Sequence, residues 1–154
     1  TVTAGNCCPL NDGAAAVVVM SDRKAKELGL TPLARVVSTA ATGLSPEIMG
    51  LGPVEATRKA LRLAGMSISD IDLYEINEAF AVQVLGSADD LGMDLDKLNV
   101  HGGAIALGHP FGSTGARITS TLLHGLAERD GTFGLETMCV GGGQGMAIIY
   151  ERLS

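Results

Sequence analysis

Apolar residues along the chain form short runs and longer periodic segments, a pattern that predicts strands and helices in alternation. The short runs are rich in β-branched residues and have the length of buried strands. We expect strands at residues 14–20, 33–39, 71–76, 98–100, 133–140 and 146–150. Helical spacing between capping residues predicts helices at residues 21–28, 53–64, 78–91 and 112–128.

This order of elements indicates an α/β domain with a mixed sheet. Helices join successive strands over most of the chain, which favours parallel pairs linked by crossovers. The last two strands meet directly through the glycine turn at residues 141–145 and are expected to form an antiparallel hairpin. Because that turn joins two strands and opens no helix, it is not a dinucleotide-binding fingerprint.

Two connections carry residues with both a structural and a functional interpretation. Asn77 lies where a helix N-cap belongs, and it also lies at a strand-to-helix junction, facing the crevice at the carboxyl end of a sheet. The connection at residues 42–52, expected to be a loop, contains the apolar residues Ile48 and Met49. From the residues alone, these two fit a loop folded back on the core better than the wall of a pocket for an apolar ligand.

The composition is that of a globular domain. Hydrophobic residues make up 46% and charged residues 18% of the 154 residues, so the chain can bury a sizeable core. A formal net charge of −6 without any basic run argues against nucleic acid or an anionic membrane as a partner. No apolar run approaches the length of a membrane span.

The cysteines and the first residues bear on compartment and completeness. Cys7, Cys8 and Cys139 are an odd number with one adjacent pair, which is no disulfide framework and fits a reducing compartment. We expect the cytoplasm, with an organelle matrix as the alternative. Because the chain starts with Thr1 in a loop-like segment, we expect it to be the back part of a longer protein.

The densest cluster of turn-forming residues lies between Gly102 and Arg117. It holds five glycines, one proline and His109, and it leads into the periodic segment of the next helix. Glycines allow a ligand or a second side chain to approach the backbone closely. On this stretch alone, a crowded structural turn and a functional histidine loop are about equally supported.

Three junctions each offer one reactive or polar side chain, from Asn77, His109 and Cys139. Each side chain follows or ends a predicted strand, so one sheet could bring all three to the same edge. A thiol and an imidazole exchange protons near neutral pH, while a carboxamide and backbone N–H groups stabilise an oxyanion. The combination suits carbonyl chemistry, although a buried cysteine and a satisfied N-cap are the structural alternatives.

Other candidate groups are weaker. His101 is expected to be a polar loop residue, and His124 a residue on the surface of a helix or partly buried there. No metal site is expected, because Cys7 and Cys8 are too close together for two ligands of one tetrahedral zinc ion.

Several motifs in the second half of the chain are recognisable together. They are Asn77-Glu78-Ala79-Phe80, Gly102-Gly103-Ala104-Ile105-Ala106-Leu107-Gly108-His109-Pro110 and Cys139-Val140-Gly141-Gly142-Gly143-Gln144-Gly145, with Asn11-Asp12-Gly13-Ala14-Ala15 and Met49-Gly50 earlier. In this order and at this spacing they resemble the C-terminal motifs of the thiolases. The resemblance covers essentially the whole chain and is highly specific, because this many motifs in register would not arise by chance.

The resemblance implies a fold and a division of the chain. Thiolases consist of two similar halves, each a βαβαβαββ unit with a mixed five-stranded sheet and flanking helices. Residues 31–154 would form the C-terminal domain, and residues 1–30 would supply the last strand (14–20) and a linker helix of the N-terminal half. The rest of the N-terminal half, including the nucleophilic cysteine, has no counterpart in this chain.

The resemblance also implies an activity and roles for residues. Thiolases cleave 3-ketoacyl-CoA with coenzyme A, or run the reverse Claisen condensation of two acyl-CoA molecules, through an acyl-cysteine. His109 matches the histidine that activates the nucleophile and lines the thioester oxyanion hole, and Asn77 matches the asparagine that holds the water of that hole. Cys139 matches the acid/base cysteine, and the Gly141 amide matches a donor of the second oxyanion hole.

Further positions match the wall of the pantetheine and acyl tunnel. These are Met49, Ala79 and Phe80, which moves Met49 toward the functional interpretation. Cys8 departs from the family pattern, since many thiolases have a serine there near the pantetheine. A thiol is a weaker hydrogen-bond partner, which makes that contact less certain than the fold.

The resemblance defines the expected partners. They are acyl-CoA and CoA as substrates, the N-terminal half and a second copy in a homodimer or homotetramer, with no permanently bound cofactor. The isolated chain is expected to be inactive. The alternatives are a stand-alone CoA-binding or dimerisation module, and a ketoacyl synthase of the same superfamily, against which Cys139 argues.

Overall fold

The computed structural model describes all 154 residues and has twelve helices and strands. In chain order they are α1 (Asp22–Glu27), β1 (Ala34–Gly43), η1 (Pro46–Leu51), α2 (Gly52–Ala64), η2 (Ile68–Asp70), β2 (Leu73–Ile76), α3 (Ala81–Leu91), η3 (Leu95–Lys97), α4 (Ala104–Leu107), α5 (Thr114–Glu128), β3 (Phe133–Val140) and β4 (Gln144–Arg152). The predicted α/β class is confirmed.

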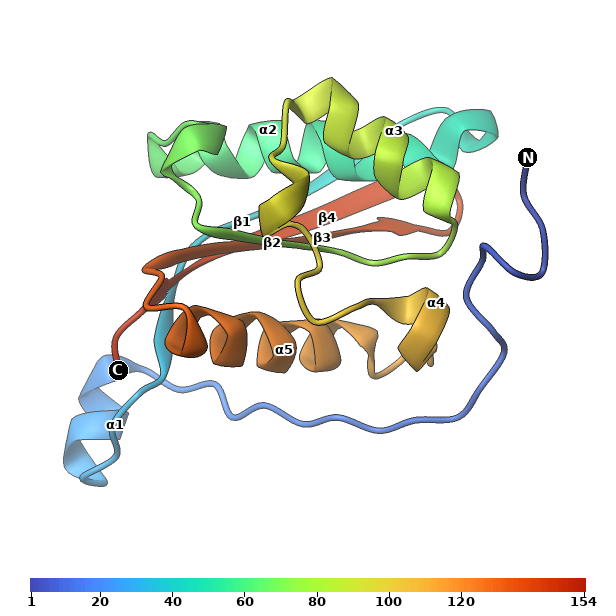
Figure 1. Cartoon of the computed structure of the whole chain (residues 1–154). Helices are drawn as coiled ribbons and strands as arrows, with labels where there is room; N and C mark the ends of the chain where they lie inside the picture. The colour runs from blue at the N-terminus through green and yellow to red at the C-terminus, as the bar shows by residue number, and fades with distance from the viewer.

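A mixed sheet forms the middle layer of the molecule. Its strand order is β1-β4-β3-β2; β1 and β3 run antiparallel to β4, and β2 runs parallel to β3. Helices α2 and α3 cover one face of the sheet and α5 covers the other (Figure 1). The predicted hairpin of the last two strands is confirmed by the β3–β4 pairing.

Most of the apolar core lies between the sheet and the α2–α3 layer. Fully or almost fully buried members of this thirteen-residue cluster include Ala56, Ala60, Ile76, Leu135 and Ile149. The alternation of side chains along each strand sends these residues to one face and their neighbours to the other. A smaller cluster of Leu73, Leu122, Leu126 and Tyr150 packs on the α5 side.

The predicted helix ends at residues 21–29 and 53–65 are confirmed. Ser21 caps α1 with its side chain, which accepts the Lys24 N–H at 3.2 Å. Pro53 lies in the first turn of α2, and Gly65 ends that helix with a φ of 68°, in the left-handed region that glycine adopts without strain.

The expected fifth strand at residues 98–100 is wrong, and the sheet has four strands. Leu98 forms only an isolated parallel bridge with Tyr74. Asn99 then turns the backbone into the left-handed region, with a φ of 47°, so the segment leaves the strand conformation. The Asn99 side chain, in place of a strand backbone, bonds to the backbone of β2. It accepts the Ile76 N–H and donates to the Ile76 carbonyl, both at 2.9 Å.

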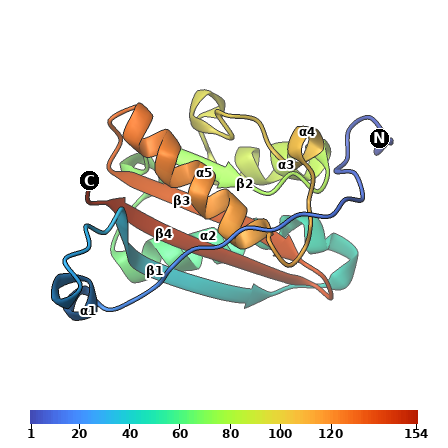
Figure 2. The same ribbon diagram turned by 90° about the horizontal axis from the view of Figure 1, so that it is seen from below.

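The strand expected at residues 14–20 is also absent. This segment is extended but pairs with no other strand, and its side chains are exposed, with Val18 at 84% and Val19 at 81%. Figure 2 shows it crossing the outside of α5, away from the sheet edges. A strand requires a neighbour to satisfy its backbone groups, and no part of this chain supplies one.

Two smaller expectations need correction. Asn77 is not an N-cap: α3 begins four residues later, with Phe80 in the N-cap position and no side-chain cap. The reason is that the Asn77 N–H still pairs with the Thr137 carbonyl of β3, at 3.0 Å, so its backbone belongs to the sheet. The loop expected at residues 42–52 is largely the 3-10 helix η1, and β1 extends to Gly43.

Candidate active site at the carboxyl ends of the parallel strands

Asn77 and Cys139 lie at the same edge of the sheet. Ile76, the last residue of β2, pairs with Thr137 in β3; Asn77 directly follows Ile76, and Cys139 lies two residues beyond Thr137 in β3. The carboxyl ends of these parallel strands, the start of α3, η1, α4 and the N-terminal segment all lie at one end of the molecule (Figure 1). This is the edge where the sequence predicted a crevice.

Asn77 has a side chain with no protein partner. The residue is 0% exposed, and neither its amide nitrogen nor its carbonyl oxygen makes a hydrogen bond within the chain. An unpaired buried carboxamide costs free energy, on the order of 1–3 kcal/mol. A group kept in this state is available to a water molecule or a ligand.

Cys139 is buried near the end of β3, with 8% of its surface exposed. Burial raises the pKa of its thiol above the ordinary value, and the nearby Cys8 thiol adds to the rise. The thiol is therefore protonated at neutral pH. In this form it can act as an acid, and after losing its proton it can act as a base.

Cys8 joins the site through the N-terminal segment. Its N–H donates to the carbonyl of Ala79 at 3.0 Å, and Cys7 bridges Phe80 in an antiparallel pair. Burial raises the Cys8 pKa, and Cys7 adds to the rise. The segment preceding α3 is thus clamped against residues 6–8, which brings Cys8, Ala79 and Phe80 together.

His109 is held at a fixed orientation between α4 and α5. Its backbone N–H donates to the Asn11 Oδ1 at 3.0 Å, and its ring Nδ1 lies 2.6 Å from the Thr114 hydroxyl. That hydroxyl also lies 3.1 Å from the Pro110 carbonyl. In the tautomer in which the hydroxyl donates to this carbonyl, Nδ1 donates to Thr114 and Nε2 is a proton acceptor.

Burial lowers the pKa of His109 below its ordinary value, and the charge of Arg117 lowers it further. The imidazole is therefore neutral at neutral pH and suited to accept a proton. The expected position of this histidine in a tight loop just before a helix is confirmed.

The glycine turn after Cys139 has two residues in the left-handed region, Gly142 with a φ of 86° and Gly143 with a φ of 89°. A Cβ at Gly143 would lie 2.3 Å from the Leu44 carbonyl oxygen, so only glycine fits the turn. A Cβ at Gly141 would meet nothing within 4 Å, so the space beside Gly141 is open. Open space beside consecutive backbone amides allows an anion to approach.

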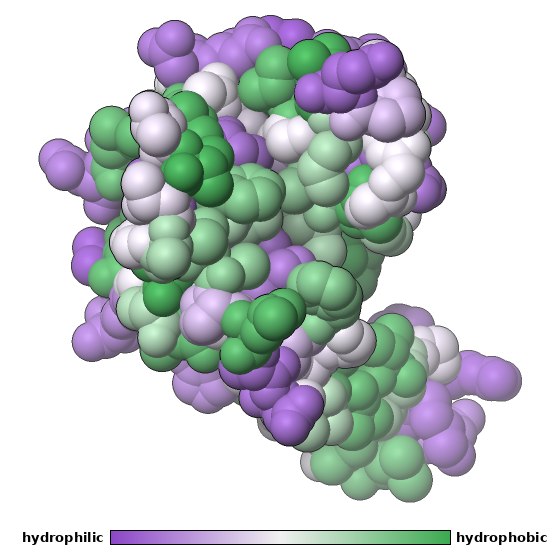
Figure 3. All heavy atoms as spheres, turned by 90° about the vertical axis from the view of Figure 1, so that its right-hand side faces the viewer, coloured by the Kyte–Doolittle hydropathy of each residue, from purple (hydrophilic) through white to green (hydrophobic).

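Met49 lies at the same end of the molecule, on the side of the sheet that α2 and α3 cover. It is half-buried in η1, which packs on α3 through Gly50, where a Cβ would lie 3.0 Å from the Gln83 Cγ. Exposed apolar side chains gather at this end; they are Ile48, Phe80, Leu107, Phe111 and Met146. Figure 3 views the molecule from this side and shows broad green patches around a hollowed middle.

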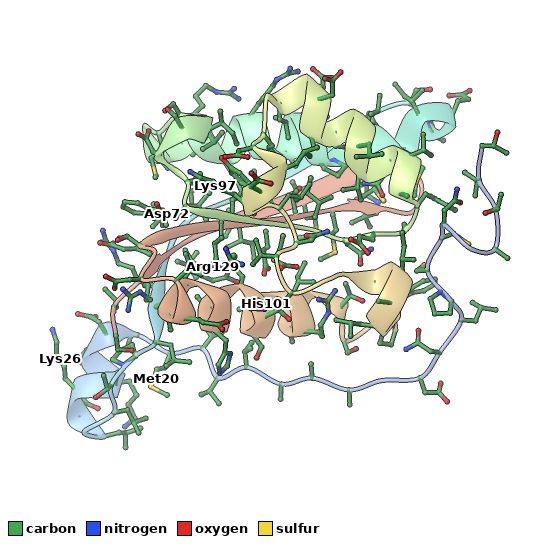
Figure 4. All side chains as sticks on the ribbon, viewed as in Figure 1. Met20, Lys26, Asp72, Lys97, His101 and Arg129 are labelled. Atoms are coloured by element: carbon green, nitrogen blue, oxygen red, sulfur yellow. The ribbon has the colours of Figure 1, made fainter.

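The two histidines that the sequence set aside lie apart from this end. His101 Nε2 lies 3.2 Å from the Glu128 carboxylate near the end of α5. His124 is exposed on α5 and bonds to the Ser120 carbonyl at 2.7 Å. Figure 4 shows His101 beside α5, and Asp72 and Arg129 toward the opposite end of the sheet from α4.

Beneath α5 lies a buried polar group that was not predicted from the sequence. Glu75 and Glu136 are paired across β2 and β3 and are 2% and 3% exposed. The Thr119 hydroxyl contacts both oxygens of Glu136, at 2.9 and 3.1 Å, and Arg117 lies 4.0 Å from Glu75. The available signal was a glutamate inside each of two strand segments composed mainly of apolar residues.

Both carboxyl groups have strongly raised pKa values. Burial raises the pKa of Glu75 to about 8, against the opposing charge of Arg117. Burial likewise raises the pKa of Glu136 to about 7, although its hydrogen bonds to Thr119 and Tyr150 favour the ionised form. The charge of Arg117 acts on both carboxyls and on the His109 imidazole.

No group of three or more histidine, cysteine, aspartate or glutamate side chains is arranged to hold a metal ion. No helix combines the length and the apolar character that crossing a membrane requires.

The arrangement combines a neutral imidazole, a protonated thiol, an unpaired carboxamide and an open glycine turn at one end of a mixed sheet. Such a set is chemically suited to acid–base chemistry at a carbonyl group. Comparison with known families agrees: the model described as "Thiolase, C-terminal domain" matches residues 30–152, and "Thiolase, N-terminal domain" matches residues 1–23. The chain belongs to the thiolase family.

Curated relatives are similar over the whole chain. An acetyl-CoA acetyltransferase of Escherichia coli (strain K12) is 59% identical over 154 residues, and a 3-ketoacyl-CoA thiolase of Marinomonas sp. (strain MWYL1) is 57% identical over 156. The alignments cover 100% and 99% of this chain but 39% and 40% of the relatives. The chain thus spans about two fifths of the length of the relatives it matches.

Solved structures share the fold. The Bacillus anthracis acetyl-CoA acetyltransferase superposes with a TM-score of 0.96 at 52% identity, over 99% of this chain and 39% of that one. The human mitochondrial 3-ketoacyl-CoA thiolase in complex with CoA gives a TM-score of 0.93 at 47% identity, again over 99% and 39%. The predicted thiolase-like fold is confirmed, with four strands in place of five.

Proposed function

We propose that this chain is the C-terminal part of a thiolase that cleaves 3-ketoacyl-CoA with coenzyme A, or condenses two acyl-CoA molecules. In this proposal residues 31–154 form the C-terminal domain, and residues 1–30 belong to the N-terminal half, which carries the acyl-cysteine. The observation that carries the proposal is the unpaired, fully buried Asn77 carboxamide beside the Cys139 strand end. It supports an oxyanion site, because nothing else in the chain satisfies this group.

Each group has a role that its environment supports. The Nε2 atom of His109 accepts the proton of the nucleophilic thiol, and its imidazolium then helps to stabilise the thioester oxyanion. Asn77 holds a water molecule in the same oxyanion hole. Cys139, protonated by virtue of its burial, delivers a proton to the α-carbon during cleavage and removes it during condensation. The Gly141 amide donates to the second oxyanion.

Substrate binding rests on the apolar end of the molecule. Met49, Ala79 and Phe80 would line the pantetheine and acyl tunnel, and Cys8 would lie near the pantetheine. CoA and acyl-CoA are substrates in this account, and no cofactor is permanently bound. The proposed assembly is a homodimer or homotetramer of the full-length protein.

The test is thiolysis of acetoacetyl-CoA by the full-length protein that carries this chain. His109→Ala and Cys139→Ala should each lower kcat at least about 10³-fold while the melting temperature stays close to that of the unmodified protein. The matched controls are His124→Ala on the exposed face of α5 and Cys7→Ala beside Cys8, which should keep activity within about two-fold. Activity unchanged in both site variants would remove the proposal.

The second candidate is a stand-alone module for CoA binding or dimerisation. Intact mass in cells separates the two: a product near 15.8 kDa supports the module, and one more than twice as large supports the enzyme. The isolated chain should show no thiolysis, because the acyl-carrying cysteine is absent from it.

A further inference from the structure

Glu78 has no part in the proposed chemistry, yet it contacts two separate segments beside the site. It is half-buried and forms no ion pair. Its Oε1 accepts the side-chain amide of Asn99 at 3.0 Å, and its Oε2 accepts the backbone N–H of Ile105 at 3.1 Å. A partly buried carboxylate that receives only neutral donors is held by hydrogen-bond geometry and not by charge pairing.

Asn99 fixes one side of this contact. Its side chain bonds to both backbone groups of Ile76, the last residue of β2, and its second amide hydrogen goes to Glu78. Both amide hydrogens and the carbonyl oxygen are therefore used. Glu78 is thus attached to a side chain that is itself locked on the strand preceding Asn77.

The Glu78 carboxylate fills the space directly beside the Gly103 Cα. A Cβ at this position would lie 2.2 Å from the Glu78 Cδ and 2.4 Å from its Oε2. The Gly103 backbone is extended, with a φ of −142°, a conformation that any residue adopts. A side chain at this position would therefore have to displace the Glu78 carboxylate.

The other side of the contact leads to His109. Ile105 lies in α4, and the chain continues through Gly108, with a φ of 98°, into the histidine. His109 is otherwise held by Asn11 and Thr114, neither of which belongs to the strand that carries Asn77. Glu78 is the neighbour of Asn77, so it spans the gap between the two catalytic segments.

We propose that Glu78 is a positioning residue that sets the placement of the His109 loop relative to Asn77. Its consequence for catalysis rests on the proposed thiolase function, whereas its structural consequence does not. Displacement of a catalytic group by about 1 Å can cost on the order of 10²-fold in rate. Losing this contact should therefore lower kcat without changing substrate affinity, because Glu78 lines no part of the proposed tunnel.

The first experiment is hydrogen exchange of the full-length protein by mass spectrometry. Glu78→Gln keeps the side-chain volume but replaces one of the two acceptor oxygens by an NH₂ group, which cannot accept. Exchange in peptides covering residues 103–109 should become at least about ten-fold faster. The matched control is Glu55→Gln on the exposed face of α2, which should leave these peptides unchanged; unchanged exchange in Glu78→Gln would overturn the proposal.

The second experiment is thiolysis of acetoacetyl-CoA. Glu78→Gln should lower kcat about 10- to 100-fold, with KM for CoA within about three-fold. Gly103→Ala should reproduce the loss by displacing the carboxylate, and it tests the same contact if Glu78→Gln does not fold. In a Glu78→Ala background, Gly103→Ala should cost nothing further, because the group it displaces is gone.

The outcomes are distinguishable from failure of the proposed function. If the unmodified protein shows no thiolysis, the thiolase proposal fails, and hydrogen exchange still decides whether Glu78 holds the loop. If exchange rises while kcat is unchanged, or if the Glu78→Ala and Gly103→Ala losses are additive, the positioning role is wrong.

Discussion

The two faces of the sheet differ in how they are stabilised. The face under α2 and α3 carries a thirteen-residue cluster that is apolar apart from the Tyr74 hydroxyl. The face under α5 carries a four-residue cluster together with the buried carboxyls of Glu75 and Glu136. The same strands contribute to both, because successive side chains point to opposite faces.

The difference indicates a division of labour. Apolar burial on the α2–α3 side stabilises the fold regardless of pH. On the α5 side, burial of the ionisable Glu75 costs stability. The charge of Arg117 acts on Glu75 and also on His109. The stability of one face and the protonation of the site are therefore expected to respond to different substitutions.

The largest stability effect should come from the apolar face. Leu135 is 0% exposed in the middle of β3, and Leu135→Ala removes buried methyl groups and leaves a cavity. We expect a loss of about 3 kcal/mol in the free energy of unfolding, measured by urea denaturation of the full-length protein. The loss should be equal at pH 5 and pH 8; a pH-dependent loss would mean that the two faces are coupled.

The α5 face should show the opposite behaviour, with a strong pH dependence. Its two carboxyls have folded pKa values of about 8 for Glu75 and about 7 for Glu136, above their values in the unfolded chain. The folded state keeps protons that the unfolded state has released, so the free energy of unfolding is highest below about pH 5 and falls toward pH 8.

Glu136→Gln tests this dependence by keeping the shape of the neutral carboxyl and removing its titration. It should stabilise the protein at pH 8 by about 1 kcal/mol or more and have little effect at pH 5. Thermal melting at both pH values measures the difference. A variant that is less stable at pH 8 than the unmodified protein would contradict the account.

Arg117 connects the buried carboxyls to the site, and its replacement should change the pH profile of activity. Because its charge lowers the pKa of His109, Arg117→Met should raise that pKa toward the ordinary value. The acid limb of the kcat/KM profile for thiolysis should therefore move to higher pH. If the acid limb of the kcat/KM profile stays at the same pH, the Arg117 charge does not affect the pKa of the His109 imidazole.

The smallest effect is expected at Arg58, which forms two exposed ion pairs on the outer surface of the α2–α3 layer. Arg58 contacts Glu55 at 2.8 Å and Asp90 at 2.7 Å, and all three side chains are substantially exposed. Arg58→Ala should cost less than about 1 kcal/mol and should not change the thiolysis profile. It is the matched control for Arg117→Met, since both replace an arginine by a neutral residue.

The regular elements that pack on apolar neighbours were predictable from sequence. Helix α2 and strand β3 follow their hydrophobic patterns, and Pro53 and Gly65 mark the ends of the helix. The failures are local and have physical causes. Residues 14–20 have strand composition but no partner strand, and the left-handed backbone of Asn99 ends the segment expected to be a strand at 98–100.

The candidate site was predictable where residue types at strand ends carry the signal. Asn77, His109 and Cys139 stood out from their chemistry, and the thiolase motifs supplied the remaining candidates. Glu75 and Glu136 were missed because a lone glutamate in a strand resembles a solvent-facing position. Glu78 was missed because its role depends on Gly103 and Ile105, whose contacts with it no local pattern reveals.

The central claim is that Asn77, His109 and Cys139 face one acyl group at the carboxyl ends of β2 and β3. The most direct test is a crystal structure of the full-length protein with acetyl-CoA bound. The account predicts the thioester within hydrogen-bonding distance of His109, with a water molecule on Asn77 and the Cys139 sulfur facing the acetyl carbon. A thioester bound elsewhere, with the Asn77 carboxamide still unpartnered, would contradict it.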